Sequence, residues 1–116
     1  MIARQKKLQA RFYETASGRR PVREWLLEMS DQDRRSVGFD VQTVEFGWPV
    51  GMPTCRALGD GLWEVRSDLS NGVTARIIFC LIADKMILLH GFVKKTQKTP
   101  QKDLALARAR MKEILP

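Results

Sequence analysis

The chain has 116 residues, the size of an ordinary domain, and 44% of them are apolar, which supplies side chains for one core. We therefore predict a single domain over residues 1–116. The 20 basic and 13 acidic residues give a formal net charge of +7, and long-range attraction by such a charge favours nucleic acid or another anionic polymer as the partner. Positive charge that serves only solubility is the alternative interpretation.

Cysteine content and hydropathy exclude several classes of protein. Cys55 and Cys80 are too few for a disulfide framework, and neither has another Cys or His at the spacing of metal ligands. We therefore expect a reducing, cytoplasmic compartment and neither a metal nor another cofactor. The first seven residues lack the apolar run of a signal peptide, and the longest apolar stretch, residues 77–83, is too short to cross a bilayer. No membrane partner is expected.

The N-terminal half predicts one strand followed by two helices. Residues 8–13 alternate between apolar and polar side chains, which is typical of a strand buried on one face. Pro21 suits the first position of a helix, and apolar residues follow it at helical spacing as far as Met29. Ser30 is suited to cap a second helix, which we expect to end before Pro49.

The C-terminal half predicts a sheet and one helix. Residues 47–61 are rich in Gly and Pro and are expected to form a loop. Three β-rich runs with short connections then predict an antiparallel meander, at residues 62–66, 74–82 and 85–93. Thr99 as cap and Pro100 as first residue predict a last helix. The fold class is therefore α+β, with an antiparallel sheet of about four strands, two N-terminal helices and one C-terminal helix.

Alternation along the meander sorts its side chains by face. Trp63 and Val65 are expected in the core, whereas Glu64 and Arg66 point to the opposite face. Arg76 on the next strand is expected to point the same way, so that two arginines are presented on a solvated face. A cross-strand ion pair of Glu64 with Arg66 or Arg76 that has no function is the alternative.

A basic segment follows the last predicted strand. Between residues 94 and 112 there are seven basic residues and a single acidic one, Asp103. The start of a helix carries partial positive charge and free amides, so Lys94, Lys95 and Lys98 beside it predict a site for an anion. A purely solubilising role is the alternative, although acidic residues would then be expected among the lysines.

His90 is the only histidine. Alternation with Met86, Leu88 and Phe92 puts it on a mostly apolar face, which favours a buried, hydrogen-bonded histidine over a catalytic one. The chain has no Gly-rich phosphate loop, HExxH metal motif or GxSxG elbow, so hydrolases of those classes lose their main support.

Three segments carry a resemblance to a known family: LGDGLWEVR (58–66), ARIIF (75–79) and LLHGFVKKTQKTP (88–100). Together they resemble the phage-derived Gp49-like branch of the RelE/HigB toxin superfamily, over about residues 8–115. The resemblance implies a small RelE-like fold and the toxin of a type II toxin-antitoxin system, an endoribonuclease that cuts messenger RNA and thereby inhibits translation. The implied partners are mRNA on the ribosome and a cognate helix-turn-helix antitoxin (HigA-like).

The resemblance also implies site residues. The family's basic residue on the first strand of the meander falls on Arg66, its central-strand arginine on Arg76, and its basic residue after the last strand on Lys95 or Lys94. These arginines and Lys95 are then the expected catalytic residues. Four further residues are expected to bind RNA: Lys94, Lys98, Lys102 and Arg56.

Cleavage of RNA without a metal uses the substrate's 2′-hydroxyl as nucleophile and needs cations to stabilise a dianionic phosphorane. Arginines suit that task because their charge is fixed and their donors match phosphate oxygens. The group that transfers protons stays open between Lys95, Glu64 and His90, because the tyrosine or histidine that many relatives carry near the start of the last helix is absent. A non-catalytic, phage-derived module that binds RNA or DNA is the alternative function, as is a structural phage protein.

Overall fold

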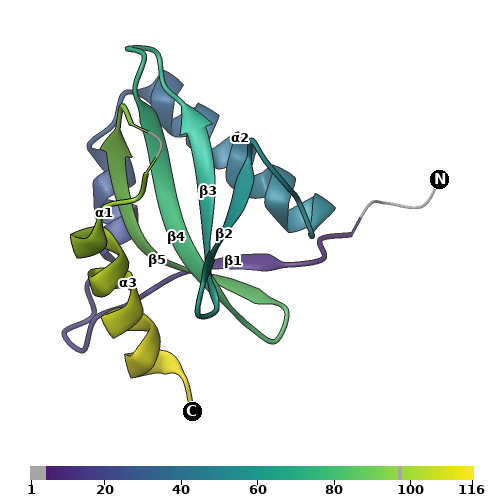
Figure 1. The fold of residues 1–116 in the computed structure, drawn as a ribbon, viewed down its shortest axis with the longest axis vertical. Coiled ribbons are helices and arrows are strands. Elements are labelled where there is room, and N and C mark those ends of the chain that lie inside the picture. The colour runs from purple at the N-terminus through teal and green to yellow at the C-terminus, as the bar shows by residue number, and fades with distance from the viewer. Residues whose placement is uncertain (1–4, 97) are drawn as a thin grey trace.

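The computed structural model describes residues 5–96 and 98–116. Figure 1 shows a twisted sheet with helices on both sides. In chain order the elements are β1 (Gln9–Phe12), α1 (Pro21–Leu27), α2 (Asp31–Gly47), β2 (Cys55–Gly59), β3 (Leu62–Asp68), β4 (Thr74–Ile82), β5 (Lys85–Lys94) and α3 (Gln101–Ile114). None of the helices within the described ranges is long and apolar enough to cross a membrane.

The sheet has five strands in the order β1-β5-β4-β3-β2. The α+β class and the antiparallel meander of β3, β4 and β5 are confirmed. The prediction of about four antiparallel strands is wrong, because β1 pairs in parallel with β5 and β2 adds a fifth strand. The first two helices follow β1 and do not open the fold. β1 pairs with a strand that begins more than 70 residues later in the chain, with Gln9 opposite Lys85. A local sequence pattern cannot predict such a pairing.

β2 lies in the segment that the sequence predicts as a loop. It pairs with β3 through a tight turn in which Asp60 and Gly61 have positive φ angles of 55° and 83°. An Asp-Gly pair between two short runs is a hairpin signal, whereas the glycines and prolines around it predict a loop. The missed strand places Arg56 directly opposite Glu64.

The two helices before the sheet cover one of its faces. α1 begins at Pro21, and Ser30 caps α2 by accepting a hydrogen bond from the Asp33 backbone N–H at 3.2 Å, both as predicted. Their apolar side chains pack on alternate residues of the strands in a core that includes Val22, Val44 and Phe79. This core fixes the position of α1 and α2 against the sheet.

α1 approaches β5 closely at one point. A Cβ built on Gly91 would lie 2.4 Å from Cε3 of Trp25, so only glycine leaves room for the indole ring. Glycine at position 91 and tryptophan at position 25 are therefore sterically coupled, although 66 positions separate them.

α3 covers the other face of the sheet and is the helix nearest the viewer in Figure 1. Ala107 and Met111 pack on the apolar half of that face. Polar contacts hold the helix as well: the Tyr13 hydroxyl lies 3.0 Å from the Glu113 carboxylate, and Arg110 donates to the Leu89 carbonyl at 2.7 Å.

Candidate functional site

Rows of side chains cross the sheet on the face that α3 partly covers. Residues directly opposite each other on antiparallel strands point to the same face, with neighbouring strands about 4.8 Å apart. The pairing therefore defines three rows: Arg56–Glu64–Ile78–His90, Arg66–Arg76–Phe92 and Asp68–Thr74–Lys94. Most of the site residues predicted from the sequence belong to these rows.

The centre of the rows is a buried ion pair. Nε of Arg76 and Oε1 of Glu64 lie 3.3 Å apart, and the two side chains are 1% and 0% exposed. The sequence places Arg76 on this face, which is confirmed, but the expectation that it is presented to solvent is wrong. Of the two ion pairs considered above, the structure contains the Glu64–Arg76 pair, with both side chains buried.

The loop between β5 and α3 covers this pair. Arg76 donates to the carbonyl oxygen of Thr96, and the Thr99 hydroxyl donates to Oε2 of Glu64 at 2.7 Å. Thr99 is therefore not the helix cap that the sequence predicts: α3 begins at Gln101, and Pro100 is the N-cap. The ion pair and these two hydrogen bonds fix the loop across β3 and β4.

Two further arginines lie close to the pair. Burial lowers the pKa of Arg76, the Glu64 carboxylate raises it, and the like charges of Arg66 and Arg56 lower it further. An arginine remains protonated in a protein despite such a shift. Arg56 and Arg66 therefore lie near enough to Arg76 to repel its charge, and the rows carry a surplus of positive charge on one face.

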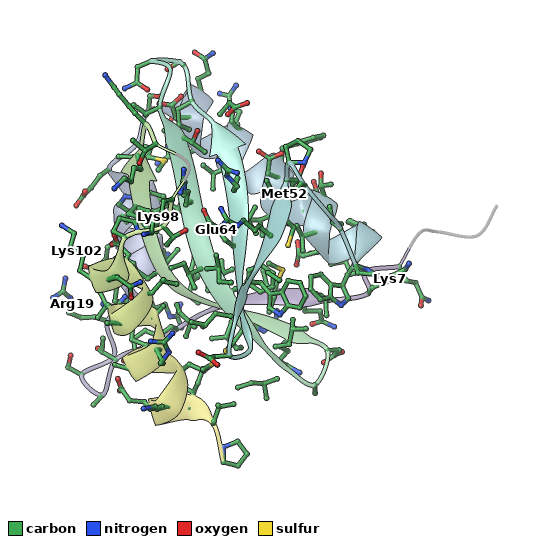
Figure 2. All side chains as sticks on the ribbon, in the orientation of Figure 1. Lys7, Arg19, Met52, Glu64, Lys98 and Lys102 are labelled. Atoms are coloured by element: carbon green, nitrogen blue, oxygen red, sulfur yellow. The ribbon has the colours of Figure 1, made fainter. Side chains whose placement is uncertain are left out.

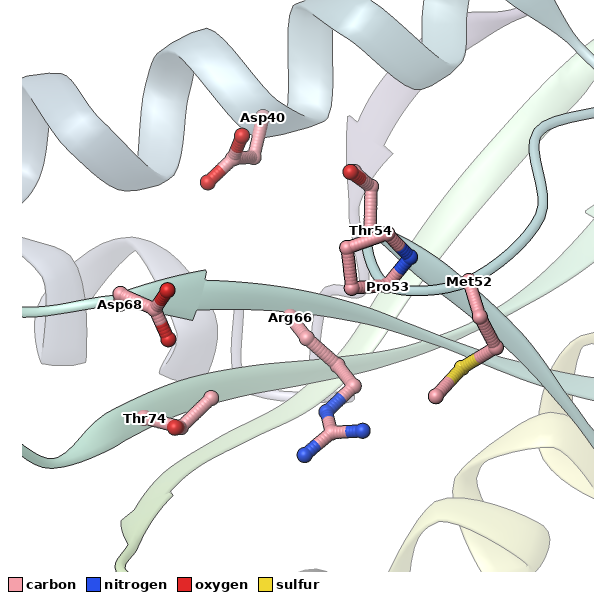
Figure 3. A pocket seen from close by; sticks show the side chains of 7 residues that line it. All are labelled: Asp40, Met52, Pro53, Thr54, Arg66, Asp68 and Thr74. Carbon is pink, nitrogen blue, oxygen red and sulfur yellow. The ribbon is translucent and has the colours of Figure 1, made fainter.

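Arg66 lines a cavity of about 420 Å³ at the end of the sheet (Figure 3). The other lining residues are Asp40, Met52, Pro53, Thr54, Asp68 and Thr74. In Figure 3 the Arg66 guanidinium points away from Asp40. Arg66 is half-buried, unlike Arg76, so it is the arginine of its row that a ligand can reach.

The lysines after β5 differ in direction. Lys94 pairs with Thr74 and therefore shares the face of Arg66 and Arg76, whereas Lys95 is exposed beyond the end of the strand. Lys98 and Lys102 are exposed on the α3 side, as Figure 2 shows. Among the described residues none of these four lysines forms an ion pair, so the loop and the start of α3 retain their charge.

His90 also turns toward α3. The β4–β5 register shifts at Ile78/Phe79, and this β-bulge puts His90 opposite Ile78, on the other face from Leu88. The prediction that His90 shares a face with Met86 and Leu88 is therefore wrong. The expectation of a hydrogen-bonded histidine is confirmed: Nε2 lies 2.6 Å from Oδ1 of Asp103, and the side chain is 17% exposed.

Comparison with protein families agrees with the resemblance. A family model for phage-derived Gp49-like proteins (DUF891) matches residues 24–112. The chain belongs to this family. No curated protein matches it. The family match extends from α1 into α3 and includes every residue of the three rows, whereas β1 lies outside it.

Two residues that hold the candidate site in place are not predicted by the sequence patterns. Thr99 and Asp103 hold Glu64 and His90, which precede them by 35 and 13 residues. No spacing rule connects such positions. Within residues 5–96 and 98–116, no three His, Cys, Asp or Glu side chains lie together in a way that could hold a metal ion.

Proposed function

We propose that this Gp49-like protein is the toxin of a type II toxin-antitoxin system and cuts messenger RNA on the ribosome without a metal. The observation that carries the proposal is the concentration of cations on one face of the sheet. Arg56 and Arg66 flank the Arg76–Glu64 pair, and the loop fixed above that pair adds lysines without ion-pair partners in the described chain. Such a surface suits a phosphate backbone.

In the proposed reaction, the 2′-hydroxyl of the RNA attacks the adjacent phosphorus and the 5′-oxygen leaves. Arg66 stabilises the charge that develops on the nonbridging oxygens, because its guanidinium is the accessible one in its row. Arg76 and Glu64 act as positioning residues, since they hold the Thr96–Thr99 segment in place. Lys95 contributes to phosphate binding from the turn.

Proton transfer in this reaction falls to the groups that a substrate can reach. Glu64 is fully buried and engaged by Arg76 and Thr99, which makes it the weakest of the three candidates. His90 is partly exposed and oriented by Asp103, as a general base is in many active sites. We therefore assign His90 the role of general base. Lys94 or Lys95 protonates the leaving oxygen.

One observation favours a second candidate function, a non-catalytic RNA-binding module. The loop covers Arg76 completely, so a residue that the family resemblance makes catalytic does not meet substrate in this arrangement. Binding by Arg56, Arg66 and the lysines would survive without any cleavage.

Cleavage of a translated message by the purified protein separates the two functions. We expect the wild-type chain to cut, and Arg66→Ala to cut about 100-fold more slowly because it loses the donor to the phosphorane. Arg108→Ala is the matched control, because Arg108 lies on α3 outside the three rows and pairs with exposed Asp60 at 3.4 Å, and it should cut normally. A single 2′-deoxy nucleotide at the cut site should abolish cleavage there. Binding of the message without cleavage by the wild-type protein would support the second function.

The proposed antitoxin partner has its own test. An acidic segment of a helix-turn-helix antitoxin encoded beside this gene would cover the same cations, so the complex should form faster at low salt. We would mix the two purified proteins and follow complex formation and cleavage together. A complex that cuts as fast as the free protein would contradict the toxin assignment.

A further inference from the structure

A second cavity, of about 300 Å³, lies between the end of β5 and the start of α3. It is lined by Phe92, Val93, Lys94, Pro100, Lys102 and Asp103. It shares no lining residue with the cavity at Arg66. Its chemistry combines one aromatic ring, two lysines and one carboxylate.

The ring of Phe92 is held from one side. His90 stacks on it with ring centres 5.6 Å apart and planes at 20°, and Asp103 holds the imidazole at 2.6 Å. Phe92 is only half-buried, although it is a large apolar residue on the α3 face. A fixed aromatic ring at the wall of a cavity is a surface on which another flat ring can stack.

The two lysines lie on either side of the strand-helix junction. Lys94 ends β5, Lys102 is in the first turn of α3, and neither forms an ion pair with a described residue. Phe92 pairs with Arg76, which pairs with Arg66, so the backbones of Phe92 and Arg66 are two strand spacings, or about 10 Å, apart. The second cavity therefore continues the cationic surface beyond Arg66.

We propose that this cavity is a nucleotide subsite in which one base of single-stranded RNA stacks on Phe92 while Lys94 and Lys102 bind the neighbouring phosphates. The inference rests on the proposed function and adds to it that the bound RNA is single-stranded. A base in a duplex is already stacked and offers no free face, whereas an unpaired base does. An acidic peptide suits the cavity less well, because it would bring carboxylates to Asp103, whereas a base brings amino groups.

The test uses a short RNA that carries 2′-O-methyl groups, so that it cannot be cut, and one 2-aminopurine. We expect the wild-type protein to quench the 2-aminopurine fluorescence, as stacking does. Phe92→Leu should bind about ten-fold more weakly and quench little, whereas Phe92→Trp should retain both properties. The matched control is Phe39→Leu on α2, which removes an aromatic ring that is 69% exposed outside the rows and should change neither.

Lys102→Ala keeps the test decisive if Phe92→Leu fails to fold, because Lys102 is exposed. This variant should bind more weakly and with a shallower dependence on salt. The subsite would be overturned if Phe92→Leu bound RNA within two-fold of wild type, or if the wild-type protein did not quench the fluorescence. It would also be overturned if Phe92→Leu lost binding of a glutamate-rich peptide more strongly than it lost binding of RNA. If Arg66→Ala loses cleavage while Phe92→Leu binds and cuts normally, only the subsite fails. If no RNA is cut by the wild-type chain but Phe92-dependent stacking persists, only the catalytic function fails.

Discussion

The two faces of the sheet are covered in different ways. The face under α1 and α2 is buried through apolar contacts, with the indoles of Trp48 and Trp63 edge to face at 4.9 Å. The face under α3 is apolar only beneath the helix itself, and next to it the loop buries Arg76 and Glu64. Burying an ion pair costs desolvation that apolar side chains of the same volume avoid. The difference indicates that the pair is there to hold the loop and its lysines.

Replacing one member of the ion pair should produce the largest effect. Arg76→Ala leaves the Glu64 charge buried without its partner, and we expect the free energy of unfolding to fall by about 3–5 kcal/mol in a urea titration. The double variant Arg76→Met with Glu64→Leu should recover most of that stability but should cut RNA poorly, since the loop loses its support. A loss below about 1 kcal/mol in Arg76→Ala would show that the pair is solvated and that the two faces are alike.

The loop contact should matter next. Thr99→Val keeps the shape of the side chain but removes the hydroxyl that donates to Glu64, so the free energy of unfolding should fall by about 1.5–3 kcal/mol. Thr99→Ser retains the donor and serves as the control. Equal stability of the valine and serine variants would contradict the role of this hydrogen bond.

The apolar face should respond to volume and not to charge. Gly91→Ala forces the Trp25 ring to move, and we expect a loss of about 1–3 kcal/mol measured by thermal or urea unfolding. Gly38→Ala is the matched control, because a Cβ at that position of α2 meets nothing within 4 Å and alanine favours a helix by about 1 kcal/mol. If both variants change stability by the same amount and sign, Trp25 does not pack on Gly91 as described.

Ionisation of a buried thiol should leave the free energy of unfolding unchanged at neutral pH and lower it at alkaline pH. Burial raises the pKa of Cys55 from 9.0 to about 11, so the folded chain keeps a proton that the unfolded chain releases. The free energy of unfolding is therefore unaffected by this group below about pH 9 and falls as the pH rises toward 11, by up to about 1.4 kcal/mol per pH unit. Cys55→Ala should show a shallower alkaline decline than the wild-type chain. Identical slopes would mean that the thiol is not buried.

The elements predicted correctly are those with local signals. Pro21 and Ser30 start their helices because a missing N–H and a hydroxyl acceptor act within one turn. The connection at Ala83 and Asp84 leaves two strands no arrangement except antiparallel. The placement of Arg66 and Arg76 on one face followed from alternation alone, and their pairing in register confirms it.

Local sequence patterns are enough to predict the α+β class, the meander, the common face of its two arginines and the basic segment after β5, because each depends on neighbours a few positions apart. Three other features appear only in the folded chain: β1 joins β5, a bulge turns His90 toward Asp103, and the loop buries Arg76. These features depend on which distant surfaces meet. Burial and partner choice are properties of such contacts, so alternation can give the direction of a side chain but not what lies above it.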